Sequence, residues 1–279
     1  MVMQRNGKNK LFLVALTTGL ILRVVHLWFF KGSSLFLPCG PDELYHHFWA
    51  LDMVRNGFDA QGVFFRAPFY PYLLGVIYRV GGGSLLAARG VGVLAGLVSI
   101  WLGWKLTRML TGSDRAGFIA AMVFAVNPVF IYFESRLLLD YLLVPFTLAI
   151  LIFLLRTDRG WWNVLLGGVF CGLFAVTRPT ILLVMPFMAL WVFVQPRKWT
   201  DVPIPALGCL LPVLPVYVSN VSNGSPVLIS SQGGVNFYIG NNPDADGYTA
   251  EFPGLGSDWQ YLDVYRMART ERPGLGDGE

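Results

Sequence analysis

Residues 11–30 read LFLVALTTGLILRVVHLWFF, an apolar run about as long as a helix needs to cross a membrane. Basic residues precede this run, as they do in a signal peptide, but no cleavage site of small residues follows it. We therefore expect the segment to remain in the protein as a membrane anchor. The composition agrees with this, because 54% of the 279 residues are hydrophobic and only 14% are charged. The net charge of +4 consequently gives no indication of a nucleic acid partner.

Further apolar runs predict an all-α polytopic membrane protein with about seven transmembrane helices. We place these spans at about residues 11–30, 85–107, 116–133, 137–155, 161–177, 179–195 and 203–220. Three cysteines lie far apart, so neither a disulfide framework nor a metal-binding spacing is predicted. The predicted organisation is a multi-span domain over residues 1–220. Residues 221–279 follow it as an outer-side loop or as the start of a missing C-terminal region.

Lysine and arginine are distributed unevenly between the predicted loops. They follow every second span, whereas the opposite short loops hold only Arg136 and Arg178. Short loops rich in these residues stay on the cytoplasmic side of a membrane. We therefore predict a multi-pass protein of the plasma membrane, the inner membrane of a bacterium, with its N-terminus in the cytoplasm. The segment 31–84, the corner at 134–140 and the turn at Arg178 then face the outer side.

The first outer segment contains the run GPDELYHH at residues 40–47. Pro41 suits the first turn of a helix, and the acidic Asp42 and Glu43 suit its positive end. These signals predict a helix at about 41–56 that lies in the membrane interface. A carboxylate pair at the edge of the hydrocarbon is costly unless it is solvated, paired or functional. Its position therefore suggests chemistry on a lipid-borne substrate, and the alternative is a solvated helix start.

Two histidines follow the acidic pair at helical spacing. Asp42 and His46 are four residues apart, as are Glu43 and His47, so each pair shares one face of the predicted helix. We expect hydrogen bonds within these pairs to orient the carboxylates. Two side-chain ligands on a face are too few to hold a metal ion, so we predict no metal and no other cofactor.

Several motifs resemble bacterial members of glycosyltransferase family 39, from the first span to about residue 250. The motifs are the acidic pair after the first span, the aromatic helix that follows it, RAPFYP at 66–71, TRP at 177–179 and GGVNFYIGNNP at 233–243. This family belongs to the type C membrane glycosyltransferases and includes protein O-mannosyltransferases and lipid A aminoarabinose transferases. The resemblance implies a sugar donor carried on a polyprenyl phosphate, and inversion at the sugar carbon without an obligatory metal. It also implies a lipid, polysaccharide or protein acceptor on the outer side.

The resemblance also assigns roles to the acidic residues. The acceptor hydroxyl must lose a proton as it attacks, and a carboxylate serves as general base. We predict that Asp42 is this base and that Glu43 shares the role or binds sugar hydroxyls. Asp140 resembles the second acidic position of the family, and its alternative is a structural salt bridge with Arg136.

The leaving polyprenyl phosphate gains negative charge, which fixed cations stabilise. We predict that Arg178 binds this phosphate, with Arg66 and Arg89 as further candidates. The alternative for each arginine is that its guanidinium group extends to the polar surface of the membrane and contacts lipid head groups.

Three other side chains complete the predicted substrate-binding set, namely Tyr45 and His46 on the interfacial helix and Asn241 in the outer-side tail. Members of the family typically cross the membrane more often than this chain, which looks like the N-terminal half of a longer protein. Two other readings stay open at this point. One is a transporter or lipid-handling membrane protein without catalysis, and the other is an inactive, truncated fragment of a glycosyltransferase.

Overall fold

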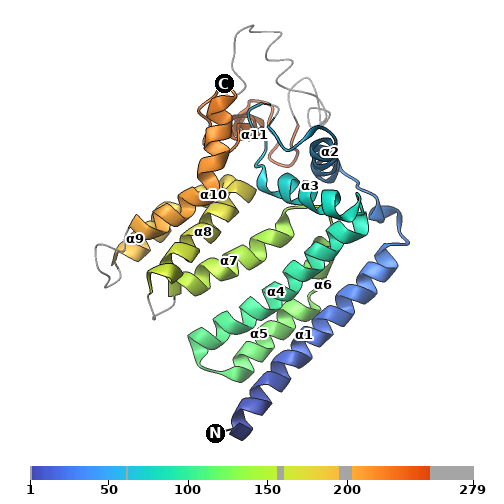
Figure 1. Ribbon diagram of the computed structural model, residues 1–279, viewed down its shortest axis with the longest axis vertical. Helices are drawn as coiled ribbons and strands as arrows, with labels where there is room; N and C mark the ends of the chain where they lie inside the picture. The colour runs from blue at the N-terminus through green and yellow to red at the C-terminus, as the bar shows by residue number, and fades with distance from the viewer. Residues whose placement is uncertain (1, 61, 156–159, 195–202, 252–279) are drawn as a thin grey trace.

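The computed structural model describes residues 2–60, 62–155, 160–194 and 203–251, and every regular element in these ranges is a helix. The helices of the bundle are α1 (Val2–Phe30), α4 (Leu85–Thr111), α5 (Asp114–Val126), α7 (Asp140–Leu155), α8 (Trp161–Thr177) and α10 (Pro203–Ser222) (Figure 1). The other elements are η1 (Ser34–Phe36), α2 (Pro41–Asn56), α3 (Phe69–Gly81), α6 (Pro128–Glu134), η2 (Pro179–Leu183), α9 (Met185–Val194) and α11 (Gln232–Asn241). The predicted all-α class is therefore confirmed.

Among the described residues, three helices are long and apolar enough to cross a membrane, and they cover Lys10–Phe30, Leu85–Thr111 and Pro203–Ser222. A fourth span results if α5 and α6 are taken together, although the pair bends by 55° where Pro128 interrupts the helix. Helices α7 and α8 are apolar but shorter, at 16 and 17 residues. The chain is thus a membrane protein with three or four candidate spans, and the seven predicted spans are not shown.

One predicted span differs in form from the expectation. The run at 179–195 begins with the short 3-10 helix η2 and continues as α9, which has only ten residues. Helix α8 ends at Thr177, and η2 begins at Pro179. The helix does not continue through Pro179, because proline has no N–H group to donate the next backbone hydrogen bond. A ten-residue helix is too short to cross a bilayer by itself.

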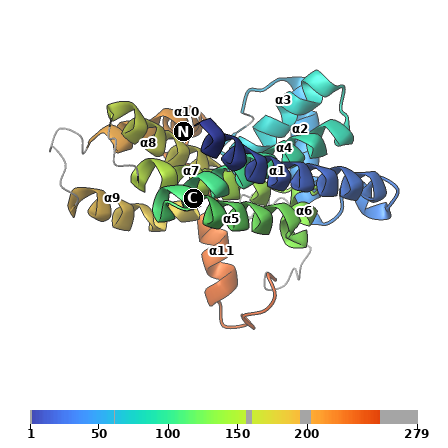
Figure 2. The same ribbon diagram turned by 90° about the horizontal axis from the view of Figure 1, so that it is seen from below.

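The polar segments collect at one end of the bundle. Figure 1 shows α2, α3 and α11 at the end opposite the N-terminus, and Figure 2 shows α11 projecting away from the long helices. The helix predicted for residues 41–56 is confirmed as α2, which has Pro41 in its first turn and ends at Gly57. Helix α3 packs against α2 through Ala50, Tyr70 and Leu74, which are buried in a common apolar cluster.

Glycines allow α8 and α10 to approach each other closely. A Cβ atom on Gly168 would lie 2.1 Å from the carbonyl oxygen of Pro205, and one on Gly172 would lie 2.4 Å from that of Cys209. On α10, a Cβ on Gly208 would lie 2.3 Å from the carbonyl oxygen of Leu165. Helices in lipid associate through such backbone contact, because burial of apolar side chains provides little drive there.

A buried ion pair joins the first half of the bundle. Arg23 of α1 is 1% exposed, and its Nε and Nη2 donate to the two carboxylate oxygens of Glu134 at 2.5 and 2.8 Å. Gly92 and Gly96 of α4 leave room for this glutamate, since a Cβ on either residue would overlap it. Burying two charged side chains inside a bundle is favourable only when they have opposite charges and bond to each other. The pair was not predicted from the sequence.

Replacing Gly168 by alanine should destabilise the protein through this helix contact. The added methyl group collides with the backbone of α10, and such overpacking typically costs about 1–3 kcal/mol. The control is Gly90→Ala in α4, because a Cβ on Gly90 meets nothing within 4 Å. Thermal unfolding in detergent should show a lower midpoint for Gly168→Ala and an unchanged or higher one for Gly90→Ala. Equal midpoints would contradict the close contact of α8 and α10.

Candidate functional site

A polar cavity of about 290 Å³ opens at the end of the bundle that carries α2 and α11. Its lining comes from α2, the loop before α3, the corner that leads into α7, the turn between α8 and η2, and the first part of α11 with the segment before it. The lining residues are Asp42, His46, Arg66, Ala67, Leu138, Leu139, Asp140, Thr177, Arg178, Pro179, Thr180, Ser230, Gln232 and Asn236. We call this cavity the polar pocket. It brings together five predicted site residues from four separate segments.

Two ion pairs line the polar pocket. Arg66 Nη1 donates to the carboxylate of Asp42, and Arg178 Nη1 donates to Asp140 Oδ1 at 3.0 Å. The Asp42 side chain is 60% exposed, and those of Arg178 and Asp140 are 50% and 41% exposed. Pairs this exposed contribute little to stability, so a ligand can replace one partner at small cost. The pocket therefore offers both accessible carboxylates and accessible guanidinium groups.

Arg66 is the less exposed of the two arginines, at 12%. Its guanidinium carbon lies 4.5 Å from the ring centroid of Tyr45, a cation–π contact that holds the arginine over α2. Tyr45 thus contacts a pocket residue without being part of the lining. In this geometry Tyr45 supports Arg66, and its predicted substrate-binding role stays a prediction.

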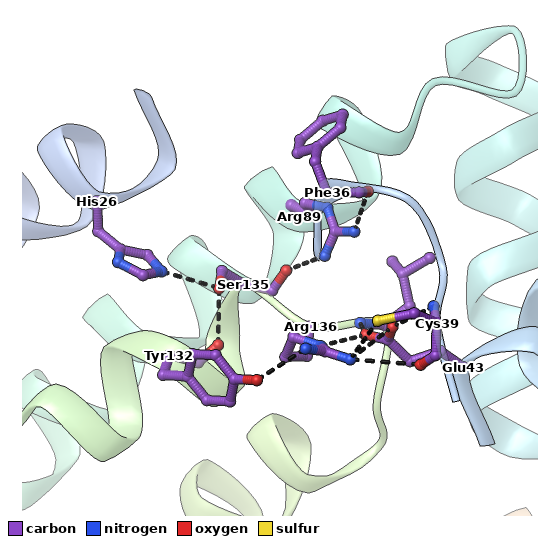
Figure 3. Close-up of polar contacts among 9 residues, drawn as sticks. His26, Phe36, Cys39, Glu43, Arg89, Tyr132, Ser135 and Arg136 are labelled. Carbon is purple, nitrogen blue, oxygen red and sulfur yellow. Dashed lines mark hydrogen bonds and ion pairs between the residues drawn. The ribbon is translucent and has the colours of Figure 1, made fainter. Parts of the chain in front are cut away.

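Glu43 is 1% exposed and does not belong to the lining of the polar pocket. Figure 3 shows it beside Arg136 and Cys39. Its carboxylate accepts hydrogen bonds from Arg136 Nε at 2.7 Å and Nη2 at 2.9 Å, and from the backbone N–H groups of Cys39 and Leu137. Burial by itself would raise the pKa of Glu43, but these donors outweigh it and the pKa is lowered. The geometry favours a structural role for Glu43 in place of the predicted catalytic one.

The hydrogen bonds predicted within α2 are not formed in the described structure. Asp42 pairs with Arg66 in place of His46, and Glu43 pairs with Arg136 in place of His47. His47 instead shares a hydrogen bond of 2.8 Å with the hydroxyl of Tyr78 on α3. An arginine forms charge-assisted, often two-pronged bonds with a carboxylate, and these are stronger than a bond from a neutral imidazole. The alternative pairing of Asp140 with Arg136 is not formed either, because Asp140 pairs with Arg178 and Arg136 pairs with Glu43.

His46 lines the polar pocket and is only 2% exposed. Its Nδ1 has no hydrogen-bond partner among the described residues. Burial and the nearby Arg66 lower the pKa of His46 to about 4, although Asp42 and Glu43 act in the opposite direction. The imidazole is therefore uncharged near neutral pH.

Arg89 lies outside the polar pocket and is completely buried. Its guanidinium donates to the carbonyl oxygens of Ser135 and Phe36, and it also lies over the rings of Phe30 and Phe36 (Figure 3). These contacts fix the connection between α1 and α2 against the corner that follows α6. The partners of Arg89 are thus backbone carbonyl groups. This buried position outside the polar pocket does not favour the predicted contact with phosphate.

Asn241 also lies outside the lining. It is exposed at the end of α11, where its Nδ2 donates to the carbonyl oxygen of Phe237 at 2.8 Å. From the same motif the structure places Asn236 in the polar pocket, and the preceding Gln232 also lines it. Sequence reasoning missed both residues, although the motif at 233–243 had indicated the segment.

The segment before α11 is held beside Arg66 by a buried asparagine. Asn220 at the end of α10 is 0% exposed, and its Oδ1 accepts from the N–H of Phe64 at 2.9 Å. Its Nδ2 donates to the carbonyl oxygens of Val227 and Ile229. The N–H groups of Ser231 and Gln232 then donate to the carbonyls of Phe64 and Phe65, each at 3.0 Å.

Comparison with known proteins identifies one family. The sequence profile described as dolichyl-phosphate-mannose-protein mannosyltransferase matches residues 66–222, which is more than half of the chain. No curated protein and no solved structure matches the chain. The matched range includes Arg66, Asp140 and Arg178 of the polar pocket, while Asp42 and His46 precede it.

Replacing Glu43 by glutamine should lower stability strongly. The change leaves Arg136 in its buried position without a countercharge, which typically costs about 3–5 kcal/mol. The control is Asp42→Asn, which removes the neighbouring but exposed carboxylate and should change the thermal midpoint little. Because the pKa of Glu43 is lowered by folding, its contribution is present above the ordinary glutamate pKa and is lost as the pH falls through the folded value. The difference in thermal midpoint between the wild type and Glu43→Gln should therefore become smaller in acid. A difference that becomes larger in acid would contradict the buried pair.

Proposed function

Because the chain belongs to the dolichyl-phosphate-mannose-protein mannosyltransferase family, we propose that it transfers a sugar from a polyprenyl-phosphate donor to an acceptor hydroxyl in the polar pocket. Membership of the family makes the protein a membrane glycosyltransferase that depends on such a donor. The observation that carries the site assignment is the convergence of two carboxylates and two guanidinium groups on one cavity. The acceptor is a lipid, a polysaccharide or a protein.

Asp42 is the proposed general base. In the reaction the acceptor oxygen bonds to the anomeric carbon of the sugar, and the bond from that carbon to the phosphate oxygen breaks. The acceptor proton passes to the Asp42 carboxylate, which is the most exposed side chain of the two ion pairs and so can be reached from solution. A single displacement of this kind inverts the configuration at the anomeric carbon. Asp140, at the other side of the pocket, is proposed to hold Arg178 in the absence of donor.

Arg178 is the proposed phosphate ligand, with Arg66 as the second cation. The phosphate gains negative charge as the sugar leaves, and fixed guanidinium groups stabilise this charge without having to reorganise. Arg178 lies directly after the last turn of α8 and is half exposed, so a lipid phosphate can displace the carboxylate of Asp140 from it. Its planar fork matches two phosphate oxygens at once.

The polar pocket is proposed to face the outer side of the plasma membrane, in a chain with seven spans and a cytoplasmic N-terminus. Arg108 in the last turn of α4 and Arg115 in the first turn of α5 flank the connection between these helices. This connection lies at the same end of the bundle as the N-terminus (Figure 1). The pocket lies at the opposite end. Residues 1–220 would then form the membrane domain, with α2 in the interface, and residues from 221 onward would cover the pocket from outside.

Asp42→Asn should abolish most of the transfer activity. Loss of a general base lowers the rate by roughly two to four orders of magnitude, while folding and donor binding should be retained. Asp52→Asn is the matched control, because Asp52 is an exposed carboxylate of the same helix that accepts a hydrogen bond from Asn56 and does not line the polar pocket. Transfer from a polyprenyl-phosphate sugar, beginning with mannose, would be measured in detergent or liposomes. Near-normal turnover of Asp42→Asn would rule out the proposed base.

Arg178→Lys should weaken donor binding even though the charge is kept. Lysine loses the planar, two-pronged hydrogen bonding that suits a phosphate group. We therefore expect the affinity for the donor to fall by roughly tenfold or more. Arg79→Lys is the control, since Arg79 is exposed on α3 and does not line the polar pocket. The dissociation constant of a polyprenyl-phosphate sugar would be measured for the three proteins. Equal affinity in all three would show that Arg178 only reaches toward lipid head groups.

A further inference from the structure

Two side chains of the polar pocket, His46 and Arg66, each have a buried polar atom without a hydrogen-bond partner among the described residues, and of the two only His46 carries no ion pair there. His46 Nδ1 is buried and has no partner among the described residues, although the side chain lines the cavity. Native proteins pair nearly all buried polar atoms, because an unpaired one typically costs about 1–3 kcal/mol. A side chain that lines a cavity and has unused hydrogen-bonding capacity is suited to a group that a ligand brings.

The ring of His46 is held in a fixed orientation. Tyr70 of α3 packs against it edge to face, with ring centroids 5.0 Å apart and an interplanar angle of 82°. Tyr45 packs in the same manner from the preceding position of α2, at 5.9 Å and 78°. Because Tyr70 is itself 1% exposed, the imidazole has little room to swing toward another partner. Its polar atoms are therefore preorganised for a ligand.

The chemistry of the imidazole indicates what kind of group it binds. The charged groups around it are Arg66, Asp42 and Glu43, and the ring itself is neutral near pH 7. A neutral imidazole has one N–H donor and one acceptor nitrogen, which complements a hydroxyl group that can both accept and donate. A phosphate is better served by the two arginines. The pocket thus contains a charged part around Arg178 and a neutral hydrogen-bonding part at His46.

Depth in the pocket distinguishes the two substrates. Asp42 is 60% exposed and lies where an acceptor arrives from solution, whereas His46 lies one helical turn further along α2 and is 2% exposed. The group enclosed between the phosphate ligand and the base is the sugar of the donor. We propose that His46 binds a hydroxyl of this sugar and thereby determines which sugar donors the protein accepts. The inference rests on the proposed function, since it takes the ligand to be a polyprenyl-phosphate sugar.

Donor binding tests this role. The probes are short-chain polyprenyl phosphates that carry a hexose, their monodeoxy analogues, and polyprenyl phosphate alone. The wild type should bind one monodeoxy analogue roughly tenfold more weakly than its parent, the loss expected for one hydrogen bond. His46→Phe should bind this pair equally and leave the affinity for polyprenyl phosphate alone unchanged. His46→Asn should recover part of the preference, because its amide lies near the position of Nδ1.

His47→Phe is the matched control, because His47 is the neighbouring residue of α2 and bonds to Tyr78 outside the pocket lining. It should keep the preference of the wild type. Should His46→Phe fail to give a folded protein in thermal unfolding, His46→Leu takes its place with the same expectation.

Three results would overturn the role of His46. The apolar variant could keep the full preference, it could weaken the binding of every probe equally, or the wild type could bind polyprenyl phosphate alone as tightly as the sugar donors. The last result would still agree with the proposed phosphate site at Arg178. If the wild type bound none of the polyprenyl phosphates, the proposed function itself would fail, so the two failures are distinguishable.

Discussion

The polar end of the molecule depends on the buried pair of Glu43 and Arg136. A carboxylate with so little exposure needs its charge balanced and its oxygens bonded, and Arg136, Leu137 and Cys39 together do both. The pair fixes the first turn of α2 against the corner between α6 and α7. Since Asp42 precedes Glu43 and Asp140 lies on the far side of that corner, the same contact sets both carboxylates of the polar pocket.

The sequence predicted what depends on local signals. Proline and two acidic residues at 41–43, with a glycine at 57, were enough to predict α2 with its observed bounds. Apolar runs likewise predicted where helices occur. They did not predict the bend at Pro128 or the division of the run at 179–195 into η2 and α9, because an apolar run has the same composition whether or not its helix is broken. The polytopic class was therefore predicted better than the number of spans.

Partners across the chain were beyond sequence reasoning. The pairing of Asp42 with His46 was sound for an isolated helix, but Arg66 and Arg136 approach from other segments and replace the histidines. In the same way, Arg23 meets Glu134, from which it is separated by 111 positions. Five residues of the polar pocket were predicted by type and motif. Asn236 was missed because only the folded segment shows which polar residue of its motif faces the cavity.

The exposed pairing of Arg178 with Asp140 also has a kinetic consequence. Asp140 is tethered a few ångströms from Arg178, so it acts as an internal competitor present at high local concentration for any anion that binds there. Such a competitor weakens the affinity for the incoming anion. It also shortens the lifetime of the bound anion, because Asp140 can form its ion pair with Arg178 again as soon as the anion shifts. A site built in this way favours repeated exchange of its ligand over tight retention.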